Sequence, residues 1–560
     1  MATSFWFNGK KVILPGVYST IKSGITNPLR DLDYGRILLI DTGVDTALSQ
    51  SFGSGPGING TLTNGSSPVQ EFDNVLDFRT AIGGGLFWAA ASFLFKPKGI
   101  GIPGISKLYY VKAATTVAAE MTFTPTGGGA AGGSVVLQVR NEGVVGNGVL
   151  SGTELAKGYA FILRAGKTSG KFVLDMYRGN FRGNNGSGGD LIAWDGVEID
   201  ATTPSIVVST PEFATLGEVQ SWMNTNVEFQ TSFEVKSFTI TDLGTVTAAD
   251  AVTYADYTLA ISGTDTYATT DLDDALTAVT DLDYTYILSD VYGGAAVYQS
   301  TPISTILAHI VDDAKYEKYI IIGGGKDSTE FNQATDSSIA TAEDNDTSRV
   351  VVVHGDFLKS IKVSTTTGSN VALKQYESFF KAANVLGRIL GAEPQVPGTF
   401  KTLDIDGEVH ELNKDEKEEA LQDGVLVTGY DVEFGDFTII QSINSLQDND
   451  FLVNPDGQSF TIEIERIKSQ LNKELVVLAK QRLLGQRLGV NRNTLSANDV
   501  KLFTEGYLQG KIADQTDDNL ILAFQNVTVT TVGDAYQIAY EFMPNFPVSK
   551  LFFTGTMIEI

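Results

Sequence analysis

Two Gly-Lys sequences come closest to a phosphate-binding loop in this chain. Such a loop needs a glycine five positions before the Gly-Lys pair and a Ser or Thr after it, so that backbone amides surround the phosphates. Before Gly166-Lys167 that position holds Phe161, and before Gly325-Lys326 it holds Ile320, with Asp327 after the lysine. Both sequences fail the pattern, and we interpret them as glycine-rich turns that join strands.

Residues for hydrolytic or metal chemistry also lack the arrangements that such chemistry needs. No serine stands in a Gly-x-Ser-x-Gly elbow beside a convincing His and Asp, and the chain has no cysteine. Imidazole could come only from His309, His354 and His410, and nothing in the sequence brings them together. Acidic clusters at 271–274, 343–346 and 415–419 lack the Gly and Glu spacing of a calcium loop. We therefore expect a protein that is not an enzyme and uses no metal or cofactor.

The composition is that of a folded, strongly acidic globular protein. Of 560 residues, 42% are hydrophobic and 19% charged, and the formal net charge is -27. This length predicts roughly two to four domains. The 58 glycines, with many Thr, Val, Tyr and Phe, indicate extensive β-structure. The negative charge argues against a direct nucleic-acid partner, because phosphate binding requires a basic surface.

No segment predicts export or membrane insertion. Residues 1–10 carry aromatic side chains where a signal peptide requires a continuous apolar stretch. The longest apolar segment, 83–95, is shorter than the roughly 18 residues of a membrane span, so we expect a buried helix there. We accordingly expect the protein to be made and assembled in a cytoplasm.

Changes in composition divide the chain into four parts and predict a multidomain α+β / α/β fold. The predicted parts are an extended N-terminal arm (1–24), an α/β core (25–112 with 284–397), one or two β-rich inserted outer domains (113–283) and a C-terminal α+β domain (398–560). In the core, strands and helices alternate, which favours a mostly parallel sheet covered by helices. Its expected elements are strands at 36–40, 284–288, 318–322 and 349–353 and helices at 75–95, 302–314 and 371–390.

The C-terminal part predicts strands that need partners. Ile462 is expected to begin a strand that leads into a long helix, followed by a helix at 495–512 and strands at 521–531 and 536–543. The segment 551–560 predicts a final apolar strand, whose backbone groups must be paired by the chain's own sheet or by a neighbouring subunit. Residues 460–512 contain nine basic and five acidic residues, which fits either a solvated helix face or a docking surface for an acidic partner.

Several motifs together resemble the contractile tail sheath proteins of bacteriophages and related injection machines. The N-terminal Pro15-Gly-Val-Tyr18 is similar to an arm motif of that family, and 75–95 followed by Lys107–Lys112 is similar to its helix and strand. Weaker similarities are Arg140–Asn147, in which Val145 replaces a usual Trp, together with Asn384–Gly391, the segment 424–446 and the finish through Phe542-Met-Pro544. The order and spacing of these motifs carry the resemblance over about two thirds of the chain.

The resemblance implies a structural subunit that polymerises as stacked hexameric rings around an inner tail tube and contracts to drive the tube through a bacterial envelope. The implied partners are other copies of the chain, the tail tube protein, and baseplate and tail terminator proteins, in a virion assembled in the host cytoplasm. Terminal arms would add strands to neighbouring subunits. The residues expected to make these contacts are Val12, Ile13, Leu14, Pro15, Gly16, Val17 and Tyr18 in the arm, Leu551, Phe553, Met557, Ile558 and Ile560 in the final strand, and Arg492, Lys501 and Lys511 toward the tube.

Two other functions remain open at this point. The sheath of a headless bacterial injection system fits the same motifs, and the sequence does not separate it from a phage sheath. A β-rich surface adhesin is favoured by the Gly- and Thr-rich composition of 113–280. It is disfavoured by the α/β segment 284–390 and by the lack of a signal sequence.

Overall fold

The structure is a computed structural model in which most of the chain is described. The described residues are 5–7, 10–12, 35–41, 69–82, 86–98, 102–113, 115–124, 133–142, 147–151, 154–178, 183–184, 191–192, 197–198, 205–226, 229–230, 233–240, 258–266, 269–289, 300–313, 317–325, 330–332, 337–365, 368–447, 458–483, 495–512, 520–532 and 535–545. Within them, no helix is long and apolar enough to cross a membrane.

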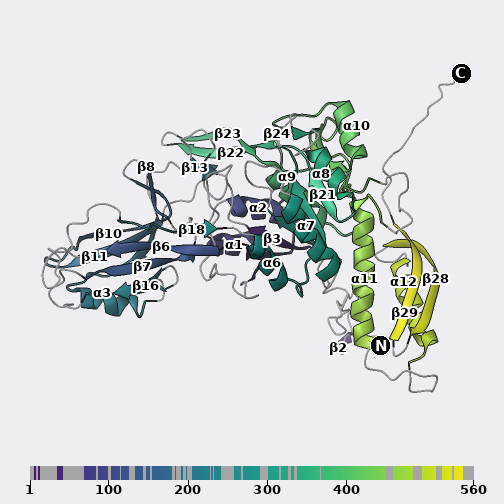
Figure 1. The fold of residues 1–560 in the computed structure, drawn as a ribbon, viewed down its shortest axis with the longest axis horizontal. Coiled ribbons are helices and arrows are strands. Elements are labelled where there is room, and N and C mark those ends of the chain that lie inside the picture. Colours follow the sequence, from purple (N-terminus) through teal and green to yellow (C-terminus); the bar gives the residue numbers. More distant parts are fainter. Residues whose placement is uncertain are drawn as a thin grey trace. The chain divides into compact units, whose positions relative to one another are not determined.

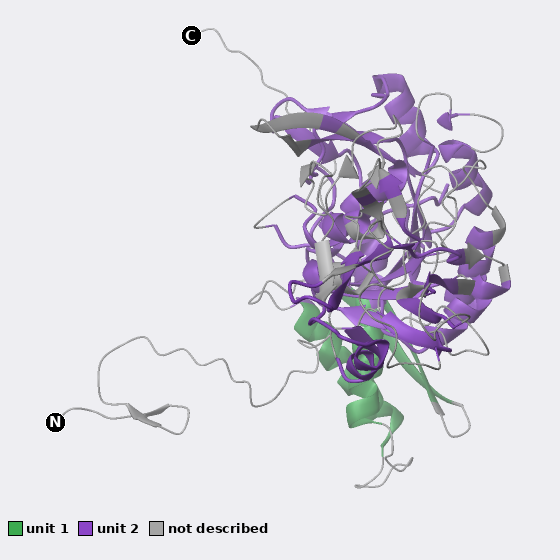
Figure 2. Ribbon diagram, turned by 90° about the vertical axis from the view of Figure 1, so that its left-hand side faces the viewer, with its two compact units in different colours: residues 1–33, 470–511, 524–541 green, residues 34–469, 512–523, 542–560 purple. Residues whose placement is uncertain are grey.

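The chain divides into two compact units, which Figure 2 shows in green and purple. The smaller unit contains residues 1–33, 470–511 and 524–541. The larger unit contains residues 34–469, 512–523 and 542–560.

A seven-stranded sheet forms the centre of the larger unit (Figure 1). In spatial order its strands are β25 (Val425–Leu426), β21 (Val350–Val353), β20 (Tyr319–Gly323), β19 (Tyr286–Ser289), β3 (Arg36–Asp41), β5 (Lys107–Lys112) and β4 (Gln70–Phe72). All neighbours are parallel except β4, which pairs antiparallel with β5 along one edge. Continuous apolar runs such as Ile37–Ile40 and Val350–Val353 form these strands because both faces of a parallel sheet are covered. The predicted mostly parallel sheet is confirmed.

Helices cover this sheet, and a glycine allows two of them to pack closely together. The helices are α1 (Val75–Ile82), α2 (Leu86–Phe95), α6 (Thr269–Ala278), α7 (Ser300–Ala308), which continues as a π-helical turn (His309–Asp313), α8 (Ser338–Asn345), α9 (Ser378–Leu390) and α10 (Lys414–Gln422). Helix α9 packs on β20, β21 and α2. At Gly387 an added Cβ would lie 2.6 Å from the Leu94 carbonyl oxygen, so only glycine allows α9 and α2 to approach this closely.

Residues between β5 and β19 in the sequence form a second, separate hydrophobic core. One four-stranded sheet contains β16 (Phe233–Phe238), β7 (Val135–Glu142), β6 (Thr115–Phe123) and β18 (Thr264–Thr266); the other contains β15 (Ser205–Ser209), β11 (Phe172–Arg178), β10 (Tyr159–Ala165) and β17 (Thr258–Leu259). Helix α3 (Leu216–Met223) packs its buried side chains into the same core, beside these strands in Figure 1. A short hairpin, β8 (Val149–Ser151) with β9 (Glu154–Lys157), completes the described part of this β-rich region.

The segment predicted as the start of a long helix at 371 is instead a strand. Residues 368–376 form β23 (Gly368–Tyr376), which pairs antiparallel with β22 (Phe357–Thr365), and α9 begins only at Ser378. The helical spacing of apolar residues continues through both segments, but pairing with the preceding strand β22 in a hairpin supplies the backbone hydrogen bonds of 371–376. The same sheet includes β24 (Gly407–Glu408) and the short strands β12 (Gly183–Asn184), β13 (Leu191–Ile192) and β14 (Val197–Glu198).

The segment after Ile462 shows the opposite error, because it was predicted as a strand and is helical. Helix α11 (Ile462–Arg482) starts at Ile462 itself, and a single bridge between Ile443 and Thr461 precedes it. Its first turns are buried on every side, since Ile462, Ile464 and Ile467 are all inaccessible to solvent. The alternation of Ile and Glu at 462–465 is the pattern of a half-buried strand, but in the helix Glu463 and Glu465 are buried as well, which explains the wrong prediction.

The C-terminal elements follow the prediction closely. They are helix α12 (Ala497–Ile512) and the antiparallel strands β28 (Ile521–Val532) and β29 (Ala535–Pro544), which form a two-stranded sheet. Another short hairpin, β26 (Thr428–Asp431) with β27 (Asp436–Ile439), precedes α11. Near the amino terminus, β1 (Phe5–Phe7) pairs with β2 (Lys10–Val12). The predicted final strand 551–560 and arm residues 13–24 lie outside the described residues.

Candidate assembly surface

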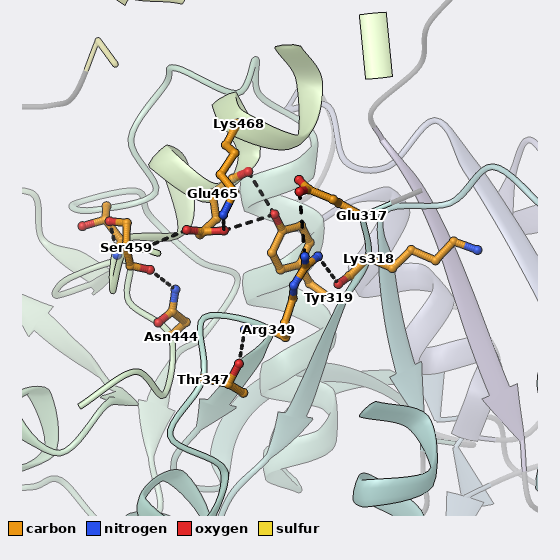
Figure 3. Close-up of polar contacts among 10 residues, drawn as sticks. Glu317, Lys318, Tyr319, Thr347, Arg349, Asn444, Ser459, Glu465 and Lys468 are labelled. Atoms are coloured by element: carbon orange, nitrogen blue, oxygen red, sulfur yellow. Dashed lines mark hydrogen bonds and ion pairs between the residues drawn. The ribbon is translucent and has the colours of Figure 1, made fainter. Parts of the chain in front are cut away.

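The first turns of α11 are fixed to the amino-terminal edge of the central sheet by buried polar contacts (Figure 3). The Tyr319 hydroxyl, at the start of β20, donates to the backbone oxygen of Glu465 at 3.0 Å. The Glu465 carboxylate accepts from the Ser459 backbone amide at 2.7 Å and forms an ion pair with Lys468 at 3.2 Å. Arg349 lies over the Tyr319 ring and donates to the Lys318 backbone oxygen. Burial raises the pKa of Glu465 above its ordinary value, even with Lys468 beside it.

A second pair of charged residues in the same turns is also buried. Arg466 donates to the backbone oxygens of Ile389 and Ala392 at 3.0 and 2.7 Å, and so satisfies carbonyls at the end of α9. The Glu463 carboxylate accepts from the Gly398 backbone amide at 2.6 Å. Burial raises the pKa of Glu463 and lowers that of Arg466. These contacts hold the base of α11 in one position against the core.

Further along, α11 and α12 are joined by a buried ion pair in the smaller unit. Lys511 of α12 lies 2.6 Å from Glu474 of α11, and their side chains are 9% and 1% exposed. The Tyr507 hydroxyl and the Gln470 amide also donate to Glu474, at 2.9 and 2.7 Å. Glu474 therefore has a donor on each of its oxygens, which is the condition for stable burial of a carboxylate.

The two-stranded sheet β28–β29 has the features of a sheet that accepts further strands. Strand β28 has twelve residues and carries no charged side chain, and β29 carries only Glu541. Tyr536 and Tyr540 of β29 donate to the Leu495 backbone oxygen and to Asn472 of α11. Among the described residues, the sheet contains no third strand, so each strand has one edge without a sheet partner. Long uncharged edges of this kind invite pairing by another strand.

One face of α12 is exposed and nearly bare. Leu502 is 58% exposed. Gly506 and Gly510 follow it at successive intervals of four residues, and a Cβ added at either would meet nothing within 4 Å. Residues four apart lie on one side of a helix, so the three positions form a smooth strip. The sequence analysis did not predict this strip. A signal was present, because each glycine inside a helix costs about 1 kcal/mol relative to alanine, and two of them in one predicted helix indicate a role other than stabilising it.

The basic residues predicted to face the tube lie in different environments. Lys501 is half exposed and forms only a surface ion pair with Glu505, at 3.7 Å. Lys511 is buried against Glu474, where it joins two helices of its own unit. Arg492 lies outside the described residues, as do Ile13, Leu14, Pro15, Gly16, Val17 and Tyr18 of the arm and Leu551, Phe553, Met557, Ile558 and Ile560 of the final strand. Val12 ends β2, which pairs with Phe5–Phe7.

The turn at Gly166-Lys167, which lacks the phosphate-loop pattern, binds a carboxylate side chain of the same chain. It joins β10 to β11, and the amides of Lys167 and Thr168 donate to the carboxylate of Glu212. These bonds, together with a side-chain contact to Thr168, lower the pKa of Glu212. Among the described residues, no group of three or more His, Asp or Glu side chains could hold a metal ion.

Comparison with known proteins identifies similar folds but no close relative. No protein-family model matches the sequence, and no curated protein matches it. A sheath tail protein from Desulfitobacterium hafniense has a similar structure, with a TM-score of 0.56 and 14% identity over 95% of this chain and 97% of that chain. A sheath tail protein from Listeria innocua gives 0.49 and 13% identity, covering 92% and 94%. The baseplate of the anti-feeding prophage gives 0.35 and 11%, covering 52% and 74%. The first of these establishes a common fold and agrees with the family resemblance of the sequence motifs.

Proposed function

We propose that this chain, which shares its fold with the Desulfitobacterium sheath tail protein, is the repeating subunit of a contractile tail sheath. The observation that carries the proposal is a fold likeness over 95% of this chain and 97% of that protein. Subunits would form stacked hexameric rings around an inner tail tube. Contraction would drive that tube through a bacterial envelope, with the energy held in contacts between subunits rather than taken from a nucleotide. The expected partners are the tube, baseplate and terminator proteins of the same particle.

Strand addition to β28–β29 is the proposed link between subunits. An isolated two-stranded sheet is marginal in water, and a third or fourth strand would stabilise it. The apolar arm 12–18 and the predicted strand 551–560 are the segments of suitable length and composition to pair with its edges in neighbouring copies. Pairing through main-chain hydrogen bonds tolerates sliding of the attached bodies, which suits a sheath that shortens without dissociating.

The exposed strip of α12 is the proposed contact with the tube. Leu502, Gly506 and Gly510 offer a surface on which another backbone can approach closely, and Lys501 beside them offers a positive charge. Lys511 is not part of this proposal, because its ammonium group is already paired with Glu474 inside the unit.

Deletion of residues 1–18 tests the polymer directly. The full chain should form striated tubes in negative-stain micrographs, whereas the shortened chain should remain folded, with unchanged circular dichroism, and fail to form tubes. An N-terminal extension of eighteen glycine- and serine-rich residues on the shortened chain controls for length. Normal tubes from the shortened chain would refute the role of the arm, and a full chain that never assembles would refute the sheath function itself.

A further inference from the structure

The tip of the β26–β27 hairpin is a rigid, exposed apolar knob. Tyr430, Val432 and Phe434 are 48%, 83% and 62% exposed. The carboxylate of Asp431 accepts from the backbone amides of Glu433 and Phe434, at 2.9 and 3.2 Å, and the Gly435 amide donates to the Asp431 backbone oxygen. Gly435 has a φ of 66°, in the left-handed region that glycine adopts without strain. These three hydrogen bonds hold the backbone of the turn, which carries the exposed side chains of Val432 and Phe434.

Such a knob is suited to docking because little conformational entropy remains to be lost. Aromatic side chains held in advance by a rigid turn are the usual anchors of protein interfaces. The Tyr430 ring already packs edge-on against Phe437, with 5.4 Å between centroids, which further limits its motion. Among the described residues, neither Val432 nor Phe434 contributes to the hydrophobic core, so packing within the chain does not account for their apolar side chains.

The surroundings of the knob are acidic, which restricts its partner. Residues 411–436 contain nine acidic and two basic residues. Strand β26 lies against α10, because a Cβ added at Gly429 would be 3.3 Å from the Lys417 ammonium. Both lysines of α10 form ion pairs with acidic neighbours, Lys414 with Glu418 and Lys417 with Glu411. The described structure gives Glu433 no cationic partner. An apolar knob within this negative field fits a surface that is both apolar and basic.

This chain itself carries such a surface, on the exposed side of α11. Val476 is 43% exposed, and Lys480, one helical turn later, is exposed on the same side of the helix. Arg482 is exposed two residues beyond. The last part of α11, residues 475–482, contains these two basic residues and no acidic one, in a chain whose net charge is -27. Copies of so acidic a protein repel one another, so contacts that match these two regions are favoured over most others.

We propose that the β26–β27 knob of one copy docks on the Val476–Lys480 face of α11 in a second copy. The contact joins two different surfaces, so it is heterologous and can repeat from copy to copy, in a closed ring or along an open helical array. This inference rests on the proposed sheath function and adds to it a specific contact between subunits, apart from the strand-pairing segments. The tube or an unrelated basic protein on the knob are alternatives that the following tests separate.

The first test removes the knob without altering the core. Phe434→Ser in the full chain should raise the subunit concentration needed for half-maximal assembly about tenfold, the effect of losing roughly one interface anchor. Val117→Ser, which alters another exposed apolar residue (49% exposed), is the matched control and should assemble normally. If Phe434→Ser assembles like the control, the docking role of the knob is wrong while the sheath function stands. If the unaltered chain forms no assemblies, the proposed sheath function itself is wrong.

The second test identifies the partner surface. Glu433→Lys and Lys480→Glu should each weaken assembly, and the two changes combined should recover most of it. Because the chain has no cysteine, Val432→Cys mixed with Val476→Cys should also crosslink between copies through a short bis-maleimide. Each variant alone should give no crosslinked dimer. Loss of assembly without recovery in the combined variant, or crosslinks only between Val432→Cys copies, would overturn the assignment to α11.

Discussion

At the scale of single residues, burial decides what each charged group does. Asp356 is 2% exposed, and it accepts from the Ser378 amide and the Gln375 side chain, both at 2.9 Å. Burial raises the pKa of Asp356 to about 6, although both hydrogen bonds favour the charged form and act to lower it. Since the folded-state pKa exceeds the unfolded one, the contribution of this group to stability is greatest below pH about 4 and declines as pH rises through 6.

Asp356→Asn removes that titration and tests it. The stability of the variant relative to the unaltered protein should increase by on the order of 2–3 kcal/mol between pH 4 and pH 7.5, with most of the change between the ordinary pKa of 3.8 and the folded-state pKa of about 6. Urea unfolding of both proteins across this range provides the measurement, and Asp415→Asn on the surface controls for loss of one negative charge. A relative stability that is independent of pH would contradict the buried, titrating carboxyl group.

Lys511 and Lys501 provide a second test at this scale. Lys511→Met leaves Glu474 without its cation inside the protein and should cost roughly 3 kcal/mol or more in urea unfolding of the unassembled chain. Lys501→Met, which breaks only a surface pair, should cost about 0.5 kcal/mol or less. If Lys511 instead faced the tube, its replacement would leave the unassembled chain as stable as before and would weaken only assembly.

At the scale of elements, the two glycines of α12 lower the stability of the helix and leave one of its faces nearly without side chains. Gly506→Ala and Gly510→Ala should each stabilise the unassembled chain by about 1 kcal/mol, because open space surrounds both positions and alanine favours helix. The double variant should nevertheless assemble poorly if another backbone rests on this strip. Thermal unfolding and tube formation are measured on the same samples, and a variant that is both more stable and fully competent in assembly would remove α12 from the proposed contact.

At the scale of the whole molecule, the two hydrophobic cores are distinct. Phe172 is fully buried in the core of the β-rich region, 6.0 Å from the ring of Phe213. Phe172→Ala should destabilise that region by about 3–5 kcal/mol and leave the central sheet intact. Hydrogen exchange should then accelerate for amides within 115–266 but remain unchanged in β3 and β19–β21. Accelerated exchange in both regions would show that the cores unfold together.

The local sequence pattern alone predicts those elements whose side chains all lie in the same kind of environment. The runs at Ile37–Ile40 and Val350–Val353 are apolar on both faces and too short for a typical helix, so they are predicted to be strands buried between layers of helices. Likewise, residue types alone predict the uncharged strand β28.

Contacts with other segments of the chain decide the structure of the remaining elements. Residues 371–376 became a strand because β22 pairs with them, and Ile462 began a helix because the end of α9 and the edge of the sheet surround it. Lys511 and Lys501 are chemically identical in the sequence, yet one is buried on Glu474 and the other meets solvent. Such outcomes depend on residues outside the local pattern, from the neighbouring strand of a hairpin to partners 77 and 146 positions away. Local spacing does not contain their placement, because every segment that converges on a site contributes to the free energy of burial there.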